Sequence, residues 1–144
     1  MGMSANEIAA KAVTLRNGVT VLNFTGGHPL TFLHSDGSTE EVAFCGLSVS
    51  AARSDEVALL GSVFTLVRTK FLKDEATSKI LDELCHLLPL DTVFLGSVIA
   101  AQVYSLQMVV GIQVGQTDRS LLVGERVYYI HPDRFTTFFV GPLD

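Results

Sequence analysis

The sequence predicts an α+β fold: a mainly antiparallel sheet of hairpins with two helices, at about residues 74–88 and 98–109. Two observations favour this class. Turn dipeptides separate pairs of apolar runs, and two apolar segments begin at residues that can cap a helix. The 144 residues are 48% hydrophobic and 17% charged, which supports a core without metal or disulfide. We expect one domain over residues 1–144, because no repeat, low-complexity segment or linker divides the chain.

Four dipeptides with turn chemistry predict the hairpins. Two of them tolerate positive φ at both central positions, as a type I′ turn requires, and two place glycine first, as a type II′ turn requires. In chain order they are Asn17-Gly18, Asp36-Gly37, Gly61-Ser62 and Gly124-Glu125. Because each lies between two apolar runs, an antiparallel meander is the expected architecture.

The first predicted helix, residues 74–88, has Asp74 as a capping residue and an apolar stripe along one side. Pro89 disfavours helical geometry at the residue before it and so ends the segment. We expect this helix to lie across one face of the sheet. A capping box over Ser4-Ala5-Asn6-Glu7 also allows a short helix before Lys11.

The second predicted helix, residues 98–109, begins after a short strand. Gly96 makes the turn, Ser97 is the N-cap, and Gly111 can stop the helix. The segment is apolar nearly all round, which predicts deep burial.

Charge and composition restrict the partners. The net charge of −5 argues against a nucleic-acid backbone, although Arg68, Lys70 and Lys73 form one basic cluster that suits a small anionic ligand. No apolar run is long enough to span a bilayer and no secretory signal is visible, so no membrane and a cytoplasmic location are expected. The high apolar fraction favours a homo-oligomer, with the tail 135–140 as a candidate edge strand. Neither a metal site nor a particular cofactor follows from the cysteine and histidine spacing.

Three motifs occur in order between Val19 and Gln102, over more than half of the chain. They read Asn23-Phe24-Thr25-Gly26-Gly27-His28, Val67-Arg68-Thr69-Lys70-Phe71 and Ser97-Val98-Ile99-Ala100-Ala101-Gln102. This arrangement resembles a family of small uncharacterised bacterial and phage proteins with the motifs Asn-Leu-Thr-Pro-His, Val-Arg-Thr and Ser-x-x-Val-Ala-Gln. Here Gly26-Gly27 replaces a single proline, and Gln116-Thr117-Asp118 is the nearest counterpart of a later Pro-Asp-Thr-Gly segment. The resemblance implies a fold and a candidate site, and no reaction.

The motif residues suggest a polar pocket at strand ends beside a helix N-terminus. Such a place offers free backbone N–H groups and a partial positive charge. Arg68 would add a planar charged fork, and His28 a group that titrates near neutral pH. The candidate ligand-binding residues are Asn23, Thr25, His28, Arg68, Thr69, Ser97 and Gln102. Five of them also have a structural alternative: turn formation for Asn23 and Thr25, a cross-strand charge for Arg68, a helix cap for Ser97 and a backbone hydrogen bond for Gln102.

Three functions therefore remain open. The first is the binding of a small anionic or nucleotide-like ligand at the candidate pocket. The second is homo-oligomeric assembly without a ligand, suggested by the apolar composition and the Phe-rich tail. The third is a hydrolase in which His28 is the general base. Whether the protein is an enzyme is left undecided by the sequence.

Overall fold

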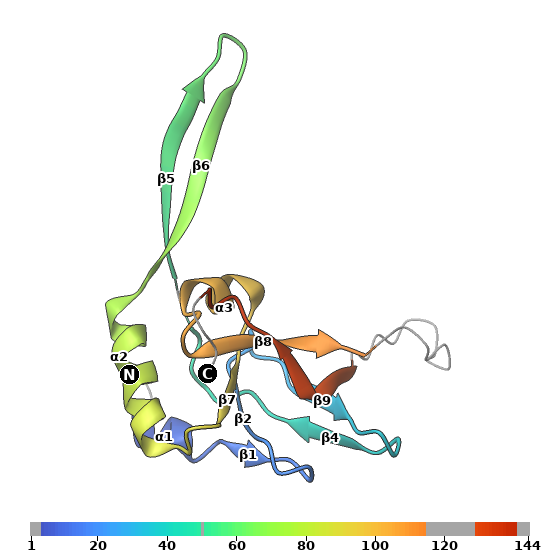
Figure 1. Cartoon of the computed structure of the whole chain (residues 1–144). Coiled ribbons are helices and arrows are strands. Elements are labelled where there is room, and N and C mark those ends of the chain that lie inside the picture. The colour runs from blue at the N-terminus through green and yellow to red at the C-terminus, as the bar shows by residue number, and fades with distance from the viewer. Residues whose placement is uncertain (1–3, 50, 115–128, 141–144) are drawn as a thin grey trace.

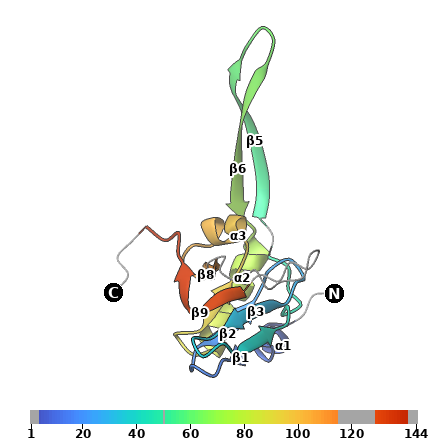
Figure 2. The same ribbon diagram turned by 90° about the vertical axis from the view of Figure 1, so that its right-hand side faces the viewer.

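The computed structural model describes residues 4–49, 51–114 and 129–140, which form a body and one long projecting hairpin (Figures 1 and 2). The α+β class is confirmed, because helices and strands both contribute to the body. The helices are α1 (Ala5–Ala9), α2 (Glu75–Leu87) and α3 (Val98–Val103). The strands are β1 (Val13–Thr14), β2 (Thr20–Asn23), β3 (Leu30–Leu33), β4 (Thr39–Val42), β5 (Ala51–Leu60), β6 (Thr65–Lys73), β7 (Val93–Leu95), β8 (Met108–Gln113) and β9 (Tyr129–Thr136).

The body sheet is mixed, which corrects the expectation of a mainly antiparallel one. Its strand order is β1-β2-β7-β8-β9-β3-β4, and the β2/β7, β7/β8 and β3/β9 pairs are parallel. A parallel pair needs a crossover connection, and α3 provides one between β7 and β8. The strands β5 and β6 form a separate two-stranded sheet.

Three of the predicted turns do join antiparallel strands. Gly18 and Gly37 have φ of 93° and 88° and lie in the β1–β2 and β3–β4 connections. Neither turn is type I′, because Asn17 and Asp36 lack the positive φ that this type requires at both central residues. Gly61 follows β5, but it lacks a positive φ, and its N–H donates to the Phe64 carbonyl across a longer loop at 2.8 Å. That turn is therefore not type II′. Gly124-Glu125 lies outside the described residues.

The first predicted helix is confirmed as α2. The Thr77 N–H donates to the Asp74 carboxylate at 3.1 Å, and the helix ends at Leu87, two residues before Pro89. Leu81 and Leu84 pack in one cluster with sheet residues, so α2 does cover a sheet face. The short N-terminal helix is also present as α1, with its capping box complete.

The second predicted helix is shorter and less buried than expected. Ser97 caps α3 by accepting from the Ala100 N–H at 3.1 Å, but the helix ends at Val103 and residues 108–113 form β8. The segment 108–113 is rich in β-branched residues, which favour a strand. Val98 and Ile99 are exposed, so α3 buries only one side.

The core consists of two clusters on opposite faces of the sheet. Along β2 and β7, Leu22 and Phe94 contact the helices, while Val21 and Leu95 contact the inside of the curled sheet. This alternation follows from the two-residue period of a strand. The helix-side cluster also contains Ile8, Leu81, Leu84, Tyr104 and Met108, and the inner cluster contains Leu15, Phe32, Val42 and Ile130.

The sheet curls so that β2 approaches the end of β4. The Cys45 N–H donates to the Asn23 carbonyl at 2.9 Å, and the Asn23 side chain donates to the Val42 carbonyl at 3.1 Å. The Phe-rich tail does not provide a free edge as expected, because Phe135 belongs to β9, which lies between β8 and β3. None of the helices in the described part of the chain is long and apolar enough to cross a membrane.

Candidate functional site

The first group of predicted site residues forms a closed hydrogen-bond cluster at the end of β2. Asn23 is buried; its Oδ1 accepts from the N–H and the hydroxyl of Thr25. Its Nδ2 donates to the carbonyls of His28, at 2.8 Å, and Val42. The side-chain amide is thus fully used within the protein. It organises a turn in which Gly26 and Gly27 have positive φ, and it leaves the His28 ring exposed.

The second group lies on the projecting hairpin. Arg68, on β6, donates to the Glu56 carboxylate at 3.1 Å, and Lys70 is 3.6 Å from the same oxygen. Thr69 lies opposite Asp55. Its hydroxyl, followed by Arg53, lowers the pKa of that carboxyl. All of these side chains are exposed, as a solvated cross-strand ion pair would be.

The third group lies on α3, where Ser97 is the N-cap and Gln102 is exposed. Among the described residues, no hydrogen bond or ion pair joins any two of these three groups. The structure therefore brings Asn23, Thr25 and His28 together, and it leaves Arg68 with Thr69, and Ser97 with Gln102, on separate elements. A small anionic ligand held by all seven residues stays a prediction without a shared cavity to support it.

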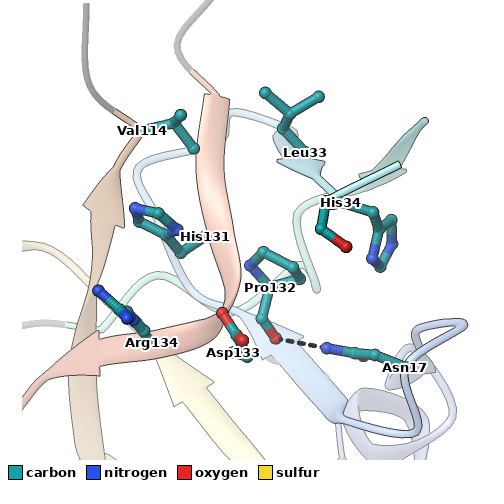
Figure 3. A pocket seen from close by; sticks show the side chains of 9 residues that line it. Asn17, Leu33, His34, Val114, His131, Pro132, Asp133 and Arg134 are labelled. Atoms are coloured by element: carbon teal, nitrogen blue, oxygen red, sulfur yellow. Dashed lines mark hydrogen bonds between the residues drawn. The ribbon is translucent and has the colours of Figure 1, made fainter. Parts of the chain in front are cut away.

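A surface pocket of about 490 Å³ lies elsewhere, around the start of β9 (Figure 3). None of the predicted site residues lines it. Its polar lining is mixed in charge, and the Asn17 side chain bridges it by donating to the Pro132 carbonyl at 2.9 Å. The residues around it include His34, His131, Asp133 and Arg134. One of these, His34, is already hydrogen-bonded to Glu40.

Glu40 links two hairpins of the body beside this pocket. Its Oε2 accepts from the Arg16 N–H at 3.0 Å and contacts the His34 Nε2 at 2.5 Å. The Arg16 N–H is the largest cause of a lowered pKa at Glu40; partial burial opposes the shift and His34 adds to it. The carboxylate therefore stabilises the contact between the β1–β2 loop and β4.

This lowered pKa predicts a loss of stability in acid. The contribution of Glu40 is complete above its ordinary value of 4.5 and is lost as the pH falls through its lower folded value. We expect the free energy of unfolding, measured in urea between about pH 6 and pH 3, to fall less steeply in Glu40→Gln than in the wild type. Glu41→Gln is the matched control, because Glu41 receives neither of these hydrogen bonds. Equal slopes for Glu40→Gln and the wild type would contradict the assignment.

Neither cysteine lies in an environment that favours its thiolate. Burial raises the pKa of Cys45, and burial followed by Asp82 raises that of Cys85, which disfavours a thiolate at either position. Within the ranges that the structure covers, no three histidine, cysteine or carboxylate side chains lie in a metal-binding group.

The outstanding surface feature is the hairpin of β5 and β6, residues 51–73, called the arm below. It extends away from the body in both views, with its base next to α3 (Figures 1 and 2). Every residue of β6 is exposed. Near the loop, seven apolar side chains are between 50 and 92% exposed. They form the apolar tip: Val57, Leu59, Leu60, Val63, Phe64, Leu66 and Val67.

The apolar tip has hydrophobic side chains on both faces of the arm. Val57 pairs with Val67, and beyond a bulge Leu59 pairs with Leu66, which places the two pairs on opposite faces. Nearer the body the arm is charged, with Arg53, Asp55, Glu56, Arg68, Lys70 and Lys73 in its stem. The sequence pattern of this hairpin does not distinguish it from a buried one, so its exposure was not predicted.

Comparisons with protein-family models, with curated proteins and with solved structures give no significant match to this chain. The resemblance to small bacterial and phage proteins therefore stays a prediction.

Proposed function

We propose that this protein is a structural subunit that assembles with copies of itself through the arm. The apolar tip is the observation that carries the proposal. An isolated two-stranded hairpin is marginally stable in water, and contiguous exposed apolar surface usually marks an interaction site. Burial of the tip in another subunit would stabilise the hairpin and would cover its exposed apolar side chains.

The charge distribution favours a second copy of the chain as the partner. Residues 51–73 contain four basic and two acidic residues, a net charge of +2. Since the whole chain carries −5, all other residues together carry −7. The arm of one copy is therefore attracted to the body of another, which speeds their encounter.

Shortening the arm tests this function. Residues 55–69 are replaced by Asn-Gly, so that Ser54 and Lys70, which are paired in the wild type, flank a two-residue turn. By light scattering after size exclusion, we expect the wild type to have a multiple of the chain mass and the variant to have the mass of one chain. Circular dichroism and the thermal midpoint show whether the body still folds. A wild type of one chain mass, or a shortened variant that still assembles, would refute the function.

Point substitutions at the tip provide a second test that leaves the arm in place. Val63→Asp with Phe64→Asp removes two of the exposed apolar side chains. Burying each is worth roughly 1.5–3 kcal/mol, so the dissociation constant should rise by at least about 100-fold. Leu90→Asp is the matched control, because Leu90 is fully exposed and lies in the loop after α2. An equal effect of both changes would argue against a specific role of the tip.

A further inference from the structure

A second exposed apolar surface lies at the base of the arm. It is called the α3 face and consists of Val98, Ile99, Gln102 and Leu106, all exposed. Val98 and Gln102 are four residues apart, the spacing of neighbours on one side of a helix, and Leu106 lies in the turn that follows α3. Both views place α3 next to the arm's base, on the body (Figures 1 and 2).

The α3 face is uncharged, and its neighbour α2 is acidic. Residues 97–107 include no charged residue. The Gln107 side chain donates to the Asp82 carboxylate of α2 at 3.1 Å, which joins the two segments. Along α2, Glu75, Asp82 and Glu83 are exposed, against one exposed lysine, Lys79.

The arm carries the complementary pattern: an apolar tip and a stem with more basic than acidic residues. We propose that the arm of one copy packs its apolar tip on the α3 face of the next copy, with its stem beside α2. This inference rests on the proposed function and adds the acceptor surface. The apolar surfaces meet each other, and Arg68, Lys70 and Lys73 approach the acidic side of α2.

The two surfaces cannot meet within one chain. The ten residues of β5 span about 33 Å, and the arm is straight, so the tip is far from the α3 face at its own base. A contact between two different patches closes as a two-fold dimer if two copies exchange arms, and otherwise produces a larger ring or a filament. Pairing of two arms with each other would instead juxtapose two segments of net charge +2 and leave the α3 face uncovered.

A mixing experiment tests the heterologous contact. One variant keeps the arm and changes the α3 face by Val98→Glu and Leu106→Glu, two exposed positions at which the core is not disturbed. The other is the shortened arm with an intact α3 face. We expect each alone to have the mass of one chain, and the equimolar mixture to form a complex of two chains and nothing larger. Leu90→Glu in place of the α3 changes is the matched control and should assemble as the wild type does.

The outcomes separate this inference from the proposed function. If the variant with the altered α3 face assembles by itself, the arms contact something else, and the acceptor is wrong while arm-mediated assembly stands. If neither variant assembles and the mixture forms no complex, the inference also fails. A wild type of one chain mass removes the proposed function and this inference together.

Discussion

Asn23→Ala is expected to lower the free energy of unfolding by about 3 kcal/mol, because the substitution removes four hydrogen bonds of a buried side chain. The carbonyls of His28 and Val42 lose the Asn23 Nδ2 as a donor, and the Thr25 N–H loses its acceptor. A buried unsatisfied group costs about 1–3 kcal/mol. Urea denaturation followed by circular dichroism measures the change. Thr25→Ala is the control, with a loss of about 1 kcal/mol or less, because Thr25 is only half-buried and gives up a single side-chain hydrogen bond to Asn23.

Asn23→Asp separates the hydrogen bonds of this side chain from its shape. The new carboxylate can still accept from Thr25, but it faces the carbonyls of His28 and Val42, which need a donor. Burial and these carbonyls raise its pKa, so its cost relative to the wild type is largest at neutral pH and shrinks as acid protonates it. The cost of Asn23→Ala should not shrink in this way. A loss below about 1 kcal/mol for both variants at pH 7 would show that Asn23 does not hold the turn.

Features set by neighbours in the chain could be predicted from the sequence. Asp74 and Ser97 cap their helices by accepting from N–H groups three residues on, and Gly18 and Gly37 have positive φ, although their turns are not type I′. These interactions need no knowledge of the rest of the fold. The closed cluster of Asn23, Thr25 and His28 is local in the same sense, and the turn-forming alternative described it correctly.

Features set by distant contacts could not be predicted. Residues 98–109 are apolar nearly throughout, yet α3 ends at Val103, and Met108 and Val109 belong to a strand because they pair with Phe94 and Leu95 of β7. A strand buried on both faces shows no alternation, so its pattern resembles that of a buried helix. The mixed pairing of the sheet has the same origin, since β7 lies between β2 and β8 although more than ten residues separate them in the chain.

The predicted site residues lie on separate elements for a related reason. Arg68 and Ser97 each have the local environment that the sequence indicates, a strand and a helix start, but the hairpin that carries Arg68 leaves the body. Hydrophobic pairs such as Val57 with Val67 are equally compatible with a core and with an interface between subunits. Sequence patterning identifies surface that must be buried, and it does not say whether the same chain buries it.

Met108→Ala and Gly96→Ala are expected to destabilise the protein separately and to compensate in part when combined. Met108 is fully buried in the helix-side cluster, so its truncation should cost about 2–5 kcal/mol. A Cβ at Gly96 would lie 2.8 Å from the Met108 Cγ and closer still to its Sδ, so Gly96→Ala should cost about 1–3 kcal/mol by overpacking. Gly96 lacks a positive φ, and backbone strain therefore adds nothing to this cost.

In the double variant the added methyl group enters the space that the methionine has left. The combined loss should therefore be smaller than the sum of the single losses by about 1 kcal/mol or more, measured by urea denaturation as a double-mutant cycle. For substitutions at sites that do not share a contact, the losses in the free energy of unfolding add to within about 0.5 kcal/mol. Additivity within that limit would mean that Met108 does not fill the space above Gly96. The turn from β7 into α3 would then need a different explanation for its glycine, because the N–H that this residue donates to the Val109 carbonyl is available from any residue except proline.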